Sequence, residues 1–348
     1  MLWTRKYAPN DLNNFKTHNE VVSVFRSFTI DTVPNLVIYG SSGSNKKTLV
    51  YALARKMYGK ELELRRVNHE IQINSTKIEI SYMESNEVIV INPSAYKNRD
   101  RVVVQHIIKK AAESRPITSF FSSRLKGHRL IIIEQAENLS KDAQAALRIT
   151  MEQYSSHFKI FMICSGINTI IEPIKSRNLF IRCRKFKNEE IKEILKEIAE
   201  KEQVTIDEEI ASQIAENAQG DCKRAISVLE LHTVINQSSV GKRSKLDLTN
   251  FKLAWEEKLE KVVKMIREGK VENLVKIRDE LYDVVVQNID PLLIMQTIHR
   301  FLENHCIKAK SESIDLLLKY QERIKLGTKP LFHIEAYVAN MMYVISRN

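Results

Sequence analysis

Short apolar runs alternate with amphipathic stretches along the first half of the chain. Residues 35–39 (NLVIY) form a β-branched and aromatic run with the length and composition of a buried strand. The loop after this run leads into an amphipathic segment over about 46–58, so the order here is strand, loop, helix. Further apolar runs of the same kind predict strands at 129–134, 159–165 and 179–183.

Two segments between these runs differ from them in the spacing of their apolar residues. Residues 61–93 place apolar or β-branched residues at every second position, which predicts an inserted hairpin, with a turn at Asn74-Ser75, leading into a strand. From 100 to 114 the apolar residues recur at intervals of three and four, which predicts an amphipathic helix. This region therefore adds two antiparallel strands and a helix to the strand–helix alternation.

The periodicity becomes helical throughout near Asn188. Before it, strands alternate with helices over residues 30–185, including a helix that Ser140 is expected to cap, and this order predicts an α/β fold with a parallel, doubly wound sheet. After it, the apolar spacing is that of helices up to the C-terminus. Three domains are expected, with the boundaries 1–186, 187–237 and 238–348.

Composition constrains the partner and the compartment. The net charge of +11 favours a polyanionic partner, because lysines and arginines gain free energy on phosphate contact through counterion release, although a basic protein without such a partner is the alternative. The four cysteines are scattered, which predicts a reducing compartment and no metal site. No run approaches the roughly 20 apolar residues that span a bilayer, so a soluble intracellular protein without a membrane partner is expected.

The strongest candidate chemistry lies in the loop GSSGSNKKT at 40–48. It nearly matches the phosphate-binding pattern G-x-x-x-x-G-K-[ST], in which main-chain N–H groups wrap a phosphate at a helix N-terminus and a lysine neutralises it. Gly40, Gly43 and Lys46 provide these groups. Asn45 replaces the last glycine, but asparagine tolerates the positive φ that this turn is expected to need. A chance match of glycines and lysine is the alternative.

Two positions weaken the metal-binding half of this pattern. Lys47 stands where a hydroxyl would coordinate Mg²⁺, and Thr48 lies about 100° further around the helix. At the end of the 129–134 run, Glu134 has the length to reach a metal, but Gln135 is neutral and cannot act as a general base. The sequence therefore predicts nucleotide binding with a doubtful Mg²⁺ site and little turnover. The alternative is that Glu134 and Gln135 simply end a core strand.

Arg177 lies in a short turn between a predicted helix and the strand at 179–183. An ordinary solvated side chain is the simpler interpretation. In a ring of nucleotide-dependent subunits, such an arginine would instead project into a neighbour's site and stabilise the charge of phosphoryl transfer.

Seven segments, in chain order, resemble the small subunits of replication factor C, the eukaryotic sliding-clamp loader of the AAA+ class. They cover nearly the whole chain and read LWTRKYAP, GSSGSNKKT, NRDRVVVQ, KDAQAALRITMEQYS, IIEPIKSRN, GDCKRA and LGTKPLFHIEAY. The doubled lysine, the degenerate acidic pair and the hairpin before INPS resemble the one small subunit whose own ATP site is thought not to hydrolyse. The resemblance implies an AAA+ P-loop domain, a helical lid and an all-α C-terminal collar that packs with four sister subunits in an open ring.

The resemblance also implies roles for single residues. Thr4 and Thr17 match positions that flank the adenine, and Glu134 matches the acidic strand end. Lys223 matches the lid arginine that senses the γ-phosphate. A lysine there keeps the positive charge but cannot form the bidentate hydrogen bonds of a guanidinium. Arg177 matches the trans-acting arginine finger. The residues matching the phosphate loop are Gly40, Ser41, Ser42, Gly43, Ser44, Asn45, Lys46, Lys47 and Thr48.

Several positions depart from the family pattern. Ala8 replaces the arginine of K-Y-R-P, Asn45 the loop glycine, Ser165 the asparagine after the sensing strand, and Asn178 the cysteine after the finger arginine. Together these departures predict weakened binding of ATP or ADP rather than its loss.

The family threads primer–template DNA through the ring, where helix N-termini and basic residues track phosphates. The candidates for this contact are Lys97, Arg99, Arg101 and Arg148. A solvated charge cluster at a helix start is the alternative.

The sequence as a whole predicts a non-catalytic, ATP- or ADP-binding subunit of heteropentameric replication factor C, not an enzyme in its own right. Its expected partners are the large subunit, three small subunits, the sliding clamp PCNA and primer–template DNA, and its expected place is the nucleus, in replication and repair. Two alternatives stay open, a stand-alone AAA+ ATPase and a structural ring subunit that has lost nucleotide. Lys47 and Gln135 are the residues that separate the three hypotheses.

Overall fold

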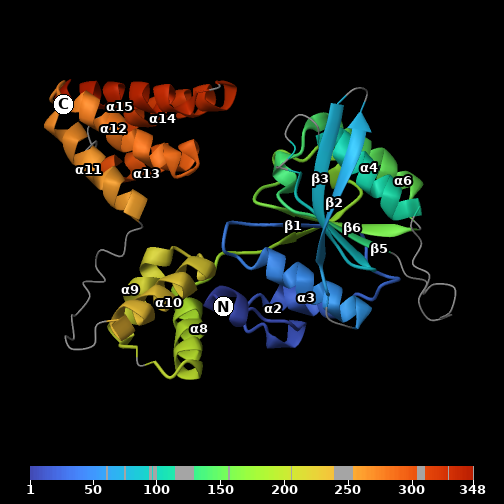
Figure 1. The fold of residues 1–348 in the computed structure, drawn as a ribbon. Coiled ribbons are helices and arrows are strands. Elements are labelled where there is room, and N and C mark those ends of the chain that lie inside the picture. The colour runs from blue at the N-terminus through green and yellow to red at the C-terminus, as the bar shows by residue number, and fades with distance from the viewer. Residues whose placement is uncertain are drawn as a thin grey trace. The chain divides into compact units, whose positions relative to one another are not determined.

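The chain forms two compact units, Met1–Leu248 and Thr249–Asn348 (Figure 1). The division of the first unit at residue 186 stays a prediction. The computed structural model describes residues 1–59, 62–73, 76–93, 96, 100–113, 129–155, 157–204, 206–238, 254–303, 310–327 and 329–347.

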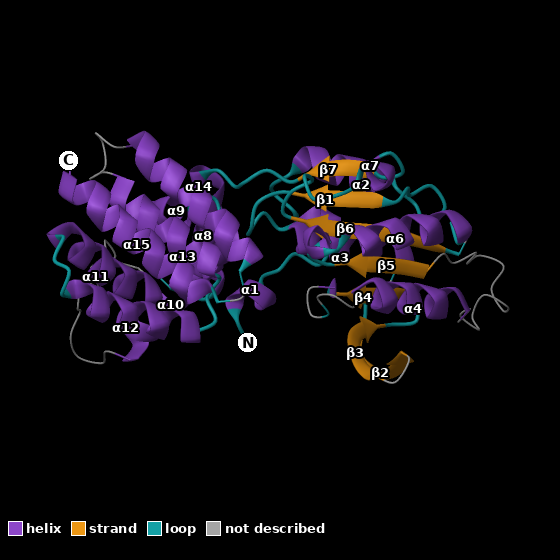
Figure 2. Cartoon of the chain, turned by 90° about the horizontal axis from the view of Figure 1, so that it is seen from above, coloured by secondary structure: helices purple, strands orange, loops and turns teal. Residues whose placement is uncertain are grey.

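A seven-stranded sheet in the order β2-β3-β4-β5-β6-β1-β7 forms the centre of the first unit, as far as the structure describes it. Its strands from β4 to β7 are parallel, and the β2–β3 hairpin joins antiparallel at one edge, where it curls away in Figure 2. This confirms the parallel sheet with an inserted hairpin; the turn at 74–75 lies outside the described residues. The strands are β1 (Leu36–Tyr39), β2 (Arg65–Ile73), β3 (Thr76–Glu84), β4 (Val88–Ile91), β5 (Arg129–Ile133), β6 (Phe158–Cys164) and β7 (Leu179–Arg182).

Helices cover both faces of the sheet because the strand residues alternate between two cores. Val37 of β1 packs in the core that α4 and α6 cover, whereas Leu36 and Ile38 pack in the core of α2 and α3. Central strands such as β5 are buried throughout, as their unbroken apolar runs predict. These helices are α2 (Asn19–Ser27), α3 (Lys46–Tyr58), α4 (Asp100–Glu113) and α6 (Lys141–Gln153).

A group of three helices, α8 (Asn188–Lys201), α9 (Glu208–Ala218) and α10 (Cys222–Ser238), follows the sheet. The chain start packs against it through α1 (Trp3–Lys6), where the Trp3 N–H donates to Glu230 at 3.1 Å. Tyr7 likewise donates its hydroxyl to Glu202 at 2.7 Å. The N-terminal segment is thereby fastened to the helices that follow the sheet.

The second unit is helical in the part that the structure describes. Its core joins apolar residues of every helix, including Leu281, Ile298 and Tyr337, which are fully buried. None of the helices in the described ranges of the chain is long and apolar enough to cross a membrane. The helices of this unit are α11 (Ala254–Glu268), α12 (Asn273–Val286), α13 (Pro291–Leu302), α14 (Lys310–Leu326) and α15 (Pro330–Arg347).

Candidate phosphate-binding site

The loop between β1 and α3 has a backbone that only particular residues adopt. Gly40 has φ 154°, and a Cβ there would lie 2.1 Å from the carbonyl oxygen of Cys183. Gly43 has φ 69°, and its Cβ would lie 2.0 Å from the Asp221 carboxylate. Asn45, which precedes α3, has φ 58°, in the left-handed region that asparagine tolerates better than most residues. The loop therefore keeps its turn although the last glycine is absent.

Lys46 lies at the centre of this loop. Its Nζ donates to the carbonyl oxygens of Gly40 at 2.7 Å and Ser41 at 2.6 Å, and lies 3.5 Å from Ser44 Oγ. The buried Ser44 hydroxyl in turn donates to the Ser41 carbonyl at 2.8 Å. Burial lowers the pKa of Lys46, while nearby acidic groups oppose this shift. The loop thus holds an ammonium beside the helix N-terminus, where an anion is bound most favourably.

Lys47 forms an ion pair with Glu134 across the sheet end, with Nζ 2.6 Å from Oε1. Tyr51, one turn further along α3, donates its hydroxyl to the same oxygen at 3.2 Å, and burial raises the Tyr51 pKa. The carboxylate that would hold Mg²⁺ is therefore already neutralised by an ammonium. These residues do not fit a divalent cation, which needs oxygen ligands and is repelled by Lys47. Thr48 lies on α3 beside them and is half-buried.

Glu137 is a second acidic residue near the loop, and the sequence reasoning missed it. It lies in the short turn Ala136–Asn138 after β5, and its charge acts to raise the pKa of Lys46. Ser165, at the end of β6, donates its hydroxyl to Glu137 Oε1 at 2.5 Å. The other oxygen, Oε2, is buried and has no hydrogen-bond partner among the described residues. The signal in the sequence was the acidic residue three positions after Glu134.

Asp221 also meets the loop, although the sequence had pointed only to Lys223 in this segment. It precedes α10, and its Oδ1 accepts a hydrogen bond from the Arg224 N–H at 2.9 Å, as a residue before a helix commonly does. The same carboxylate contacts Gly43, so the start of α10 packs directly on the phosphate loop. Lys223 follows on this helix with an exposed side chain. The helical group therefore packs against the phosphate loop, and the sensing role of Lys223 stays a prediction.

The residues predicted to flank the adenine lie near the first helices. Thr17 is buried, and Thr4 is half-buried on α1; their roles stay predictions. His18 follows Thr17, and its ring packs edge-on to Phe186 with centroids 5.2 Å apart. Burial lowers the His18 pKa, and its Nε2 is buried with no hydrogen-bond partner in the described ranges. The sequence did not indicate this buried position, because a single histidine belongs to no motif.

Arg177 lies at the other end of the sheet from the phosphate loop. It precedes β7, and β7 runs parallel to β1 with Leu179 beside Leu36, so the turn holding Arg177 is next to the start of β1. The phosphate loop follows the end of β1. The Arg177 side chain is 40% exposed; its guanidinium pairs with Glu152 at 2.7 Å and donates to the Pro173 carbonyl at 2.9 Å.

The predicted DNA-contacting residues divide between described and undescribed parts of the chain. Lys97 and Arg99 lie outside the described residues. Arg101 is exposed at the start of α4, and Arg148 is half-buried on α6, which packs beside α4. Their role stays a prediction.

A parallel sheet with a glycine-containing loop between β1 and the helix after it, followed by a helical group that closes on this loop, defines a P-loop protein of the AAA+ class. A solved mutant of RuvB from Thermotoga maritima has this fold, with a TM-score of 0.51 over 78% of this chain and 85% of that chain, at 15% identity. That likeness shows the fold alone.

Residues 255–348 match the family described as Replication factor C subunit 3, C-terminal domain. Replication factor C subunit 3 of Arabidopsis thaliana is 32% identical to this chain, over 99% of the chain and 97% of the relative. Replication factor C subunit 5 of Saccharomyces cerevisiae is 30% identical, over 98% of each. The chain belongs to the small-subunit family of replication factor C, the clamp loader of DNA replication, whose subunits assemble with one another.

The prediction that the chain is not an enzyme is wrong, because its relatives are subunits of an AAA+ ATPase family. The prediction rested on Lys47 and on the neutral Gln135. For the general base, that prediction considered only residue 135. The structure places another carboxylate, that of Glu137, near Lys46.

Proposed function

We propose that this chain binds ATP or ADP in the loop at 40–48, as a nuclear subunit of a complex with the large subunit and three other small subunits of replication factor C. The observation that carries this proposal is the loop itself, which is folded around Lys46 and lies beneath the start of α10. Membership of the family supports the assembly with sister subunits.

In this proposal the complex loads the sliding clamp PCNA onto primer–template DNA. The net charge of +11 supports contact with phosphates, and Arg101 and Arg148 are the described residues proposed to make it. They lie on α4 and α6, which pack side by side, so both side chains can contact phosphates of the same DNA strand.

The proposal is tested by assembling the complex with and without this chain and measuring retention of fluorescent PCNA on primed, end-blocked DNA. We expect retention only when the chain is present, because a ring lacking one member cannot hold the clamp in register with the DNA. Adding the purified chain back should restore retention. Loading at the full rate without the chain would contradict the proposed role.

Arg177 is proposed to act in a neighbouring subunit's ATP site. The support is geometric: the residue and its own phosphate loop lie at opposite ends of parallel neighbouring strands. Because four strand residues span roughly 13 Å, the turn that holds Arg177 is separated from its own phosphate loop by about the length of β1. An exposed arginine at that edge is available to a subunit packed there.

We also propose that nucleotide binding by this chain depends little on Mg²⁺, because Lys47 neutralises Glu134 in the place of the ion. Lys47→Thr, which supplies the missing hydroxyl, is expected to make the affinity for ATP rise about tenfold on adding Mg²⁺ (roughly 1.4 kcal/mol). The measurement is titration of a fluorescent ATP analogue in Mg²⁺ and in chelator. Lys47→Gln removes the charge without supplying a ligand and is the matched control. A parent chain with the full tenfold Mg²⁺ dependence would contradict the proposal.

A further inference from the structure

His18 carries a buried ring nitrogen that the described part of the chain does not satisfy. The residue is 5% exposed, and its Nε2 has no hydrogen-bond partner among the described residues. A buried polar atom costs free energy unless a partner forms a hydrogen bond with it, so such atoms are rare in folded proteins. Nε2 of His18 therefore requires a partner from outside these residues.

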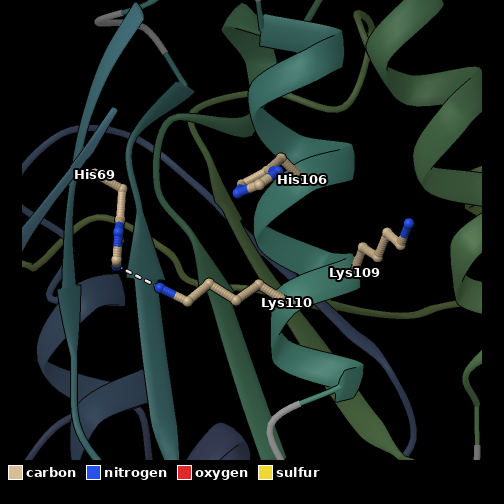
Figure 3. A pocket seen from close by; sticks show the side chains of 4 residues that line it. All are labelled: His69, His106, Lys109 and Lys110. Atoms are coloured by element: carbon tan, nitrogen blue, oxygen red, sulfur yellow. Dashed lines mark hydrogen bonds between the residues drawn. The ribbon is translucent and has the colours of Figure 1, made fainter. Parts of the chain in front are cut away.

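A second histidine shows the contrasting case, in which the protein itself supplies the partner. A cavity of about 450 Å³ between the β2–β3 hairpin and α4 is lined by His69 of β2 and by His106, Lys109 and Lys110 of α4 (Figure 3). There the Lys110 ammonium meets Nε2 of His69, and the His69 ring stacks on the Tyr82 ring with centroids 5.7 Å apart. His69 is thus satisfied within the fold, whereas His18 is not.

The surroundings of His18 come from the segment that leads into α8. Its ring packs edge-on against Phe186, with centroids 5.2 Å apart, and Phe186 is itself buried. Burial lowers the pKa of His18, and the nearby charges of Arg184 and Glu190 act on this pKa in opposite directions. These two side chains pair with each other through two hydrogen bonds, at 2.8 and 2.5 Å. The imidazole is therefore neutral near pH 7, and its Nε2 can donate or accept one hydrogen bond.

Short contacts connect this segment to the phosphate loop. The Phe186 N–H donates to the carbonyl oxygen of Gly220 at 3.4 Å, and the next residue, Asp221, contacts Gly43. His18 thus lies on the side of the loop against which the helical group packs. When the phosphates of a nucleotide lie in the loop, the base lies beyond it, because the ribose separates the two. The His18 ring has the same relation to the loop, close to it without belonging to it.

The groups around Nε2 favour a flat ligand with apolar faces and a polar edge. Small-molecule sites are lined mainly by apolar and aromatic side chains, with a few polar atoms that fix the orientation of the ligand. Here Phe186 and the His18 ring provide aromatic surface, and Nε2 provides the polar atom. No group of three or more His, Cys, Asp or Glu that could hold a metal ion occurs within the described ranges. A purine base fits, since its edge carries both donors and acceptors of hydrogen bonds.

We propose that Nε2 of His18 forms a hydrogen bond with the edge of the purine base of a nucleotide whose phosphates lie in the loop at 40–48. His18 is then the residue that makes the site prefer a nucleotide to a bare polyphosphate. This inference rests on the nucleotide binding proposed above and adds the group that recognises the base. Thr17, which was expected to flank the adenine, precedes His18 and is also buried.

The test compares ATP with inorganic tripolyphosphate, which has three linked phosphates and neither ribose nor base. Binding of each to the full chain is measured by isothermal titration calorimetry. His18→Phe keeps an aromatic ring beside Phe186 and removes both ring nitrogens. We expect this variant to bind ATP about tenfold more weakly and tripolyphosphate with unchanged affinity, because only the hydrogen bond to the base is lost.

The matched control is His157→Phe, the same substitution at another histidine of this unit. His157 is half-buried and directly precedes β6, whereas the other end of β6 meets the phosphate loop, where the Cys164 carbonyl accepts from the Gly40 N–H at 3.3 Å. This control should leave both affinities unchanged.

Ribose 5-triphosphate separates the base from the sugar, and His18→Phe should bind it as the parent chain does. If His18→Phe weakens ribose 5-triphosphate as much as ATP, the contact is with the sugar and the proposal is overturned. It is also overturned if His18→Phe binds ATP as tightly as the parent, or if tripolyphosphate binding is lost as well, because the ring then only supports the fold. These outcomes leave the proposed nucleotide binding intact, whereas a parent chain that does not bind ATP would refute both proposals.

Discussion

Lys46→Ala is expected to weaken ATP binding by this chain by about 100-fold or more. The ammonium lies within the loop, beside carbonyl oxygens at 2.6 and 2.7 Å, and brings positive charge to the N-terminus of α3. A hydrogen bond to a charged group contributes roughly 1.5–3 kcal/mol, and a polyphosphate offers Lys46 more than one such contact. Equilibrium titration with a fluorescent ATP analogue measures the change.

Ser42→Ala is the matched control for this prediction. Ser42 lies in the same loop with an exposed side chain, and its substitution keeps every main-chain N–H group. We expect its affinity to stay within about twofold of the parent chain, since the phosphate contacts of such loops come from the main chain. Circular dichroism checks that Lys46→Ala remains folded. If the Lys46→Ala chain binds ATP with an affinity within about threefold of the parent chain, the nucleotide binds elsewhere.

Arg177→Ala is expected to lower ATP hydrolysis at the neighbouring site of the assembled complex by about 1,000-fold. An arginine finger supplied from another subunit contributes about 10³–10⁵ in rate, because it stabilises the charge of the transition state. The measurement is the DNA- and clamp-stimulated ATPase rate of the reconstituted complex. This rate should fall by the contribution of that one site. Nucleotide affinity of the isolated chain should not change, because Arg177 lies at the far end of β1 from its own loop.

The matched control for the finger is Glu152→Gln. Glu152 holds the Arg177 guanidinium at 2.7 Å in the isolated chain, and the variant releases the arginine while keeping its charge. We expect this complex to retain its ATPase. An unchanged rate in Arg177→Ala, or an isolated Arg177→Ala chain that binds ATP more weakly than the parent, would exclude the trans role.

Local patterns in the sequence predicted most of the fold. The apolar run at 129–134 is strand Arg129–Ile133, and the alternating segment at 61–93 contains the hairpin β2–β3 and then β4. Ser140 caps α6, with its hydroxyl accepting from the Ala143 N–H at 3.1 Å. These elements were predictable because periodicity and capping act between residues a few positions apart.

The partners of each site residue were not predictable in the same way. The Lys47–Glu134 ion pair joins α3 to the end of β5, and the Asp221 contact with Gly43 joins α10 to the phosphate loop. Neither pair is close in sequence, and no local pattern marks them. For the same reason, the sequence pointed to Glu134 and the position next to it and did not indicate Glu137.

The sequence by itself determined the alternation of strands and helices, the loop that wraps Lys46 and the positive charge, because these depend on residue type and short-range spacing. The tertiary structure alone decided that Arg177 lies at the opposite end of β1 from its own loop, that a lysine neutralises Glu134, and that four basic side chains share one cavity. The order and direction of the strands set these arrangements, since they bring together or separate residues that are tens of positions apart.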